Sequence, residues 1–64
     1  MRNKIRLKVR GISRDEIYEK SMEVVAKYIG VATVAEARTQ ISGIEIDAEQ
    51  EGQIFVADVW INLK

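Results

Sequence analysis

The chain has 64 residues with no Cys, no His and no Pro. The missing cysteines exclude disulfides and thiolate metal sites, and the missing histidines remove the commonest catalytic base and transition-metal ligand. A domain of this size buries only about 60% of its extended-chain surface, so its stability is marginal unless disulfides, a metal or oligomerisation adds to it. Of these three aids, oligomerisation is the one that the composition favours.

The charges are unevenly placed, although ten basic and ten acidic residues give a formal net charge of zero. The start of the chain is basic (Arg2, Lys4, Arg6, Lys8, Arg10 and Arg14), and the last third is acidic (Glu45, Asp47, Glu49, Glu51 and Asp58). This asymmetry is typical of a nucleic-acid surface, but it also arises when a basic strand lies beside acidic segments of its own sheet or of a neighbouring subunit. We favour the second interpretation.

No apolar run approaches the roughly 18 residues of a membrane span, and no signal-peptide core follows Met1. The sequence therefore predicts a soluble, cytoplasmic protein without a membrane partner. Repeats, linkers and low-complexity tracts are absent from residues 1–64, so the whole chain is expected to form a single domain.

Residues 4–10 alternate between apolar and basic side chains, which predicts a half-buried strand that ends at Gly11. Ser13 and Glu16 then match a capping box, in which the serine hydroxyl caps the N–H of Glu16 and the glutamate reaches back. A helix is therefore expected from about residue 14.

The expected helix runs over residues 14–29 and ends at Gly30, because glycine favours the left-handed conformation that closes many helices. Glu16 with Lys20, and Glu23 with Lys27, are spaced to form ion pairs on its solvent side. Its apolar stripe comprises Ile17, Ser21, Val24, Val25 and Tyr28, with Tyr18, Met22 and Ile29 at the margin. A stripe this broad is typical of a helix that packs on a sheet.

Residues 34–40 alternate again, with small side chains on one face, and this predicts a second strand. At Gly43 the apolar phase changes from Ile41 to Ile44, which predicts a β-bulge. Residues 49–52 are the expected turn into a last strand.

The last strand, Ile54 to Leu63, is apolar on one face and partly apolar on the other. Such a strand is expected to be covered on both sides. The odd-numbered residues should pack on Ile17, Val24 and Tyr28 of the helix, and another copy of the chain should cover Ile54, Val56 and Trp60. The fold class predicted is α+β, with β-α-β-β order and one helix on a three-stranded antiparallel sheet of strand order 1-3-2.

Catalysis is not expected, because the hydroxyl residues have no histidine beside them to act as base. The acidic residues from Glu45 to Glu51 could offer oxygen ligands to a divalent cation, but they lack the spacing and the glycine of a dedicated Ca²⁺ loop. We favour a solvated strand that its charges protect from edge pairing.

The basic face of the first strand lacks the interleaved aromatic residues on which bases stack. If this strand pairs with the last one, its cations lie beside Asp58 and Trp60, where a salt bridge and a cation–π contact become available. Trp60 is interpreted as an interface anchor whose ring could also stack on a small planar ligand at a subunit boundary.

The arrangement resembles the dodecins, which are small flavin-binding proteins of β-α-β-β topology that assemble into twelve-subunit shells. The segments that carry the resemblance are Gly11-Ile12-Ser13, the capped helix, Val34-Ala35-Glu36-Ala37 and Val59-Trp60-Ile61-Asn62-Leu63. The resemblance implies a dodecin-like domain over residues 1–64, a homo-oligomer (a dodecamer in that family) and a flavin cofactor: FMN, FAD or riboflavin.

One departure concerns the ligand. The Trp that stacks on the flavin in dodecins corresponds to Val34 here, while Glu36 matches a family glutamate that faces the interface. By resemblance, Val34, Glu36 and Arg38 lie near the family pocket, Gln53 lies near the family's flavin-contacting glutamine, and Trp60 is a further candidate. Flavin binding then requires that Trp60, Tyr18, Tyr28 or Phe55 replaces the lost aromatic ring.

Three hypotheses follow. The first is a non-enzymatic, dodecin-like oligomer that binds or stores a small molecule between subunits. The second is a structural, self-assembling or protein-interaction module without a ligand. The third, which we favour least, is nucleic-acid binding through the basic first strand.

Overall fold

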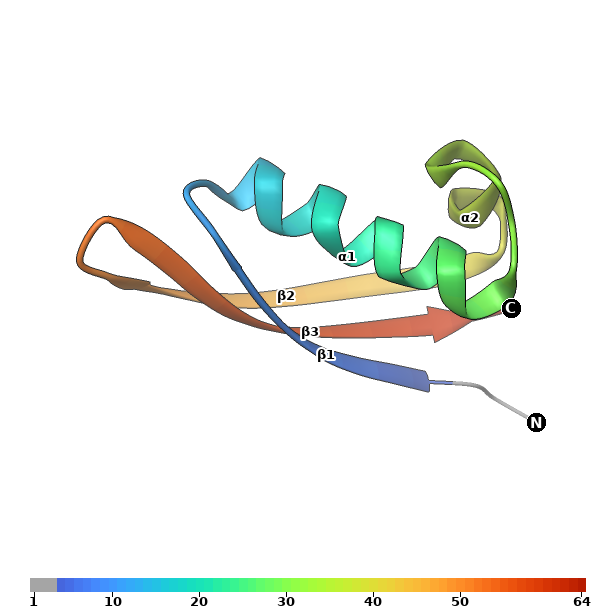
Figure 1. Cartoon of the computed structure of the whole chain (residues 1–64). Helices are drawn as coiled ribbons and strands as arrows, with labels where there is room; N and C mark the ends of the chain where they lie inside the picture. Colours follow the sequence, from blue (N-terminus) through green and yellow to red (C-terminus); the bar gives the residue numbers. More distant parts are fainter. Residues whose placement is uncertain (1–3) are drawn as a thin grey trace.

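The computed structural model describes residues 4–64, and Arg2 of the basic group lies outside them. Three strands form one antiparallel sheet in the order β1-β3-β2, and a long helix lies across one face of it (Figure 1). The elements in chain order are β1 (Lys4–Gly11), α1 (Arg14–Ile29), α2 (Val34–Thr39), β2 (Ile41–Glu51) and β3 (Ile54–Leu63). The predicted α+β class, β-α-β-β order and 1-3-2 strand order are confirmed.

The core lies between α1 and the inner face of the sheet, which is the face turned toward that helix. Ala57, Val59 and Ile61 of β3 are at most 1% exposed, as the alternation of this strand predicts. Ser21 is also buried, and its hydroxyl donates to the carbonyl of Ile17 at 2.7 Å, so the core holds no unpaired hydroxyl there. The buried apolar residues are Val9, Ile17, Met22, Val25, Ala26, Ala37, Ala57, Val59 and Ile61.

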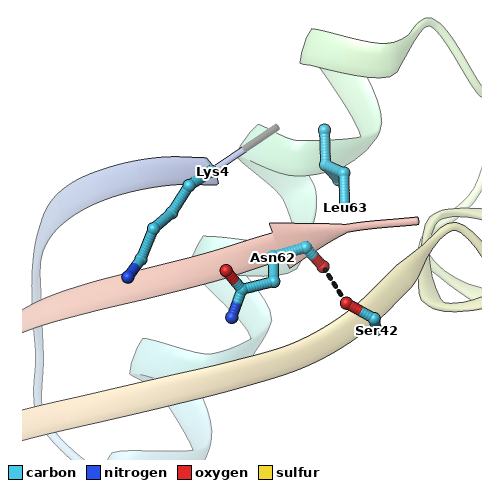
Figure 2. Close-up of a pocket in the computed structure, with 4 residues that line it drawn as sticks. All are labelled: Lys4, Ser42, Asn62 and Leu63. Atoms are coloured by element: carbon cyan, nitrogen blue, oxygen red, sulfur yellow. Dashed lines mark hydrogen bonds between the residues drawn. The ribbon is translucent and has the colours of Figure 1, made fainter. Parts of the chain in front are cut away.

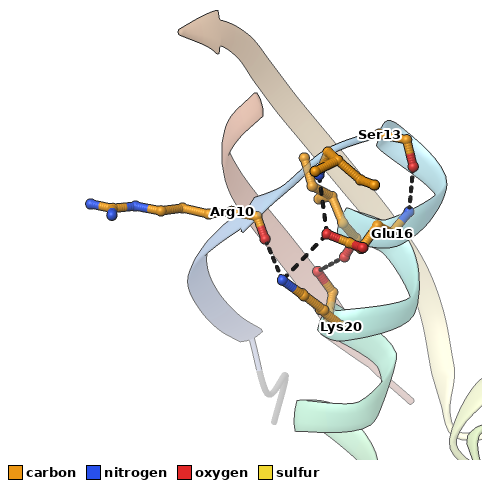
Figure 3. Close-up of polar contacts among 7 residues, drawn as sticks. Arg10, Ser13, Glu16 and Lys20 are labelled. Atoms are coloured by element: carbon orange, nitrogen blue, oxygen red, sulfur yellow. Dashed lines mark hydrogen bonds and ion pairs between the residues drawn. The ribbon is translucent and has the colours of Figure 1, made fainter. Parts of the chain in front are cut away.

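The start of α1 is tied to the end of β1 by a group of polar contacts (Figure 3). The Ser13 hydroxyl accepts the N–H of Glu16 at 3.1 Å, which confirms the predicted cap. The Glu16 carboxylate reaches back one residue further than expected and accepts the N–H of Ile12 at 3.0 Å. The Lys20 ammonium lies 3.4 Å from the same carboxylate and donates to the carbonyl of Arg10 at 2.9 Å.

Gly11 is required by this close approach of strand and helix. A Cβ atom at this position would lie 2.9 Å from the Glu16 carboxylate oxygen and 3.2 Å from Cγ1 of Ile17. The glycine therefore lets α1 begin directly after β1 while Glu16 keeps its bond to the backbone.

The strand predicted over residues 34–40 is wrong, because these residues form helix α2. Thr33 caps it as Ser13 caps α1, since its hydroxyl accepts the N–H of Glu36 at 3.2 Å. Alanine, glutamate and arginine favour helix, and the less exposed Val34 and Ala37 are three residues apart. No helix within residues 4–64 is long and apolar enough to cross a membrane.

The presence of α2 shifts the buried stripe of α1. Ala37 of α2 is fully buried, and the Arg38 guanidinium carbon lies 5.5 Å from the centre of the Tyr18 ring. Met22 of α1 is fully buried in the same core cluster as Ala37. The prediction that Val24 and Tyr28 pack under β3 is wrong, since these side chains are 44% and 68% exposed.

Strands β2 and β3 form a long hairpin that extends past the start of α1 (Figure 1). The pairing register shifts between Ile41 and Gly43, which confirms a bulge at the expected place. The turn is shorter than the predicted residues 49–52, because β2 continues to Glu51 and leaves Gly52 and Gln53 as the loop. Gly52 has φ of 64°, as a two-residue hairpin with glycine first requires.

Candidate binding face of the sheet

The outer face of the sheet, turned away from α1, carries basic side chains on β1, acidic side chains on β2 and a mixture of polar and apolar side chains on β3. Cross-strand partners share a face, so the register orders these side chains in rows. The rows are Lys4, Asn62 and Gly43; Arg6, Trp60 and Glu45; Lys8, Asp58 and Asp47; and Arg10, Val56 and Glu49. One edge of this face is therefore basic, the other is acidic, and the centre is mixed.

Trp60 lies in the centre of the outer face and is half-buried by its neighbours. The Arg6 guanidinium carbon lies 5.8 Å from the centre of the indole ring, which confirms the expected cation–π contact. Such contacts at exposed sites contribute about 0.5–1 kcal/mol. Arg6 and Glu45 flank the ring from the two edge strands.

The expected salt bridge between the basic strand and Asp58 is not formed. Lys8 is the register partner of Asp58, yet within residues 4–64 Glu16 and Lys20 make the one ion pair shorter than 4 Å. Glu23 and Lys27 of α1 are likewise not in contact at that distance. Asp58 also has Asp47 as its register partner on the other side, so two carboxylates lie side by side there.

A polar hollow lies at the end of the outer face, beside the bulge of β2 (Figure 2). It has a volume of about 500 Å³ and is lined by Lys4, Ser42, Asn62 and Leu63. The Ser42 hydroxyl donates to the carbonyl of Asn62 at 3.3 Å, while the Lys4 ammonium and the Asn62 amide extend from adjacent strands. Asn62 is two residues from Trp60 on the same face, so the hollow begins about 7 Å from the ring along the strand.

The structure separates the five residues predicted for a ligand site into three places. Val34, Glu36 and Arg38 are all on α2, where Val34 is half-buried and Arg38 rests on Tyr18. Gln53 is exposed in the hairpin turn, at the opposite end of the molecule from α2 (Figure 1). Trp60 is on the outer face, so one copy of the chain does not bring these side chains into one pocket.

The acidic residues of β2 occupy alternate positions along one extended strand. Their side chains are thus spaced about 7 Å apart, too far for three carboxylates to share one ion. Within the described part of the chain, no group of three or more acidic side chains is arranged to hold a metal. These carboxylates line the edge of the outer face instead.

The sequence did not single out Ser42 and Asn62 as members of a polar hollow. Asn62 interrupts the even-numbered face of the last strand next to Trp60, and Ser42 precedes the glycine of the bulge. Both signals are present in the sequence, but their meeting depends on the register of the bulged hairpin.

No family model matches this chain, and no curated protein or solved structure matches it either. The resemblance to dodecins is therefore supported at the level of the small β-α-β-β fold with its three-stranded antiparallel sheet. It does not extend to the family's site, because the segment that would carry the family's Trp is helical here.

Proposed function

We propose that the protein is a non-enzymatic, self-assembling protein that binds a small planar ligand on the outer face of its sheet. The observation that carries the proposal is Trp60, a half-buried ring with Arg6 against it on a face that neither helix in the described part of the chain covers. A second copy is the expected cover, as the two-sided last strand suggests.

The chemistry of the face favours a ligand with a flat ring and a polar chain. The ring would stack on Trp60 beside Arg6, and hydroxyl or phosphate groups would reach the hollow lined by Lys4, Ser42 and Asn62. Flavins have this form, so FMN and riboflavin are the appropriate probes. This site lies on β1, β2 and β3, whereas the family pocket would lie at α2.

Nucleic-acid binding is the less favoured proposal because of the same geometry. The four cations of β1 share the outer face with Asp58 and with the four carboxylates of β2, about two strand spacings or 10 Å away. Phosphates placed on the cations would be repelled by these carboxylates.

The test is a titration with FMN, with the intrinsic fluorescence of Trp60 and the flavin fluorescence as readouts. We expect quenching of both, and a loss of binding in Trp60→Leu, measured by flavin fluorescence because this variant has no tryptophan. Arg38→Ala is the matched control, since it alters the α2 position and should leave the affinity unchanged. Unchanged fluorescence at saturating FMN, or the opposite order of the two variants, would reject the outer-face site.

Self-assembly without a ligand is the second candidate function. It is favoured by Val24 and Tyr28, which expose apolar surface on α1 away from the Trp60 site. The FMN titration distinguishes the two, because FMN binding is expected only in the first, whereas light scattering of ligand-free protein tests the assembly that is expected in both. A 7.3 kDa monomer at micromolar concentration would remove both.

A further inference from the structure

A basic groove runs between the outer edge of β1 and the adjacent side of α1. It has a volume of about 400 Å³, and it is lined by four cations (Lys8, Arg10, Lys20 and Lys27) against the one carboxylate of Glu23. The apolar side chains of Val9 and Val24 complete the lining. Figure 3 shows Arg10 at this edge, with its side chain extended away from the capped start of the helix.

The groove offers both a backbone and an apolar surface to an incoming strand. β1 pairs with β3 on one side and has no partner strand on the other among residues 4–64. An unpaired strand edge is a template for another strand. Val24 of α1 lines the groove beside this edge, and Tyr28 follows one helical turn later; they are 44% and 68% exposed, so the described residues leave both largely uncovered.

The opposite edge of the same sheet has the complementary pattern. Along β2, the apolar Ile44, Ile46 and Ala48 alternate with Glu45, Asp47 and Glu49. β1 and β2 both run antiparallel to β3 and are therefore parallel to each other. A second copy placed in continuation of the sheet would set its β2 beside β1 in parallel, with acidic side chains beside the basic ones on the outer face.

We propose that β2 of one copy adds to the free edge of β1 of the next copy, filling the groove between β1 and α1. This inference rests on the self-assembly of the proposed function and names a further contact in it, at the edges of the sheet, which leaves the outer face with Trp60 free for the ligand or for another copy. The carboxylates of the incoming strand meet Lys8 and Arg10, while its apolar residues lie on the helix side, toward Val24. Each copy adds its β2 edge to one neighbour and accepts the β2 edge of another neighbour at its β1, so the contact repeats around a ring or along a filament.

Charge excludes the symmetric alternatives. Pairing β1 with the β1 of a second copy would set Lys and Arg side chains beside one another, and pairing β2 with β2 would do the same for Glu and Asp. Like charges on adjacent strands destabilise a sheet, whereas opposite charges stabilise it. The separation of charge along a chain with no net charge thus selects the β1–β2 contact.

The test uses two charge-reversed variants whose changes avoid the Trp60 site. The basic-edge variant is Arg10→Glu with Lys27→Glu, and the acidic-edge variant is Asp47→Lys with Glu49→Lys. Each alone should associate at least about tenfold more weakly than the parent chain in sedimentation velocity, because its reversed positions then face side chains of like charge on the adjacent copy. An equimolar mixture of the two should assemble again, since each edge finds an opposite edge on the other variant.

Two further measurements distinguish a lost interface from a lost fold. Circular dichroism establishes that each variant is folded, and Val24→Ser tests the groove without a change of charge and should also weaken association. Folded variants that assemble like the parent, or a mixture that stays monomeric, would overturn the interface. A parent chain that is monomeric at about 100 µM would overturn it together with the assembly. FMN binding to Trp60, followed by fluorescence, reports separately on the ligand part of the proposed function.

Discussion

The inner face of β3 packs against the helix layer, whereas no helix or strand of residues 4–64 lies against its outer face. Both faces are rich in apolar residues, yet Val59 and Ile61 are fully buried while Val56 and Trp60 keep part of their surface in water. A chain of 64 residues has one long helix to lay on one face of the sheet. The difference teaches that an apolar face of β3 belongs to the core only where the helix layer covers it, and the uncovered face is the one for which we propose binding.

The largest expected effect comes from the inner face. Ile61→Ala removes most of a fully buried side chain beneath α1 and should lower the free energy of unfolding by about 2–5 kcal/mol. Val56→Ala on the outer face is the control and should cost less than about 1 kcal/mol. Urea denaturation measures both, and equal losses would contradict the division between the two faces.

Gly11→Ala tests how tightly the inner face is closed at the end of β1. The added methyl group would push against Glu16 and Ile17, so we expect a loss of about 1–3 kcal/mol in the free energy of unfolding. Gly43→Ala serves as the control, because a Cβ there meets no atom closer than 3.9 Å. An unchanged thermal unfolding midpoint in Gly11→Ala would contradict this prediction, because it would mean that Glu16 moves away from the added methyl group without a loss of stability.

Trp60→Lys tests the outer face by itself. The change removes the central ring and adds a cation beside Arg6, so association should weaken at least about tenfold, measured by sedimentation. The monomer should stay folded, with helical circular dichroism unchanged, because the substituted side chain lies on the face opposite α1. Unfolding of the helix at the same time would show that Trp60 belongs to the core.

Ser13→Ala probes the helix that covers the inner face and should have the smallest effect. Loss of the hydroxyl that accepts the N–H of Glu16 should cost about 1 kcal/mol. Thr33→Ala removes the equivalent bond from the six-residue helix α2 and is the matched comparison. Chemical denaturation measures the free energy of unfolding of both variants. An equal loss in the two would show that the short helix, which buries Ala37, contributes to stability as α1 does.

The two caps explain which parts of the fold could be predicted. Ser13 and Glu16 precede sixteen residues of helical pattern, and the predicted bounds of α1 are confirmed. Thr33 and Glu36 have the same spacing, but six residues alternate as readily with a strand period as with a helical one. The cap was the better signal there. A capping hydroxyl at Thr33 is specific to the start of a helix, whereas an alternation over six residues is compatible with both a strand and a helix.

The exposed part of α1 could not be predicted for a related reason. Val24 and Tyr28 belong to the apolar stripe as much as Met22 does. Which of them is buried depends on α2, whose Ala37 packs into the core and whose Arg38 lies on Tyr18. Because α2 was not predicted, the side of α1 that remains exposed was predicted wrongly.

The candidate site shows the same division. Trp60 was expected on the face away from the helix, and the contact with Arg6 followed from pairing the first and last strands. The hollow of Lys4, Ser42 and Asn62 required the register on both sides of β3. Of the residues taken from the family pocket, Val34, Glu36 and Arg38 lie on α2 rather than on the predicted strand, and away from Gln53 and Trp60 of the same copy.

By itself, the sequence determined the first and last strands, the first cap, the stop at Gly30, the bulge at Gly43 and the central place of the last strand, because each depends on a local period or on one residue's backbone preference. Tertiary structure alone decided that Met22 rather than Val24 is buried, and that a basic edge and an acidic edge bound one outer face. These outcomes depend on residues far apart in the chain, which compete for the same surface of α1 and of the sheet and are placed by packing rather than by local preference.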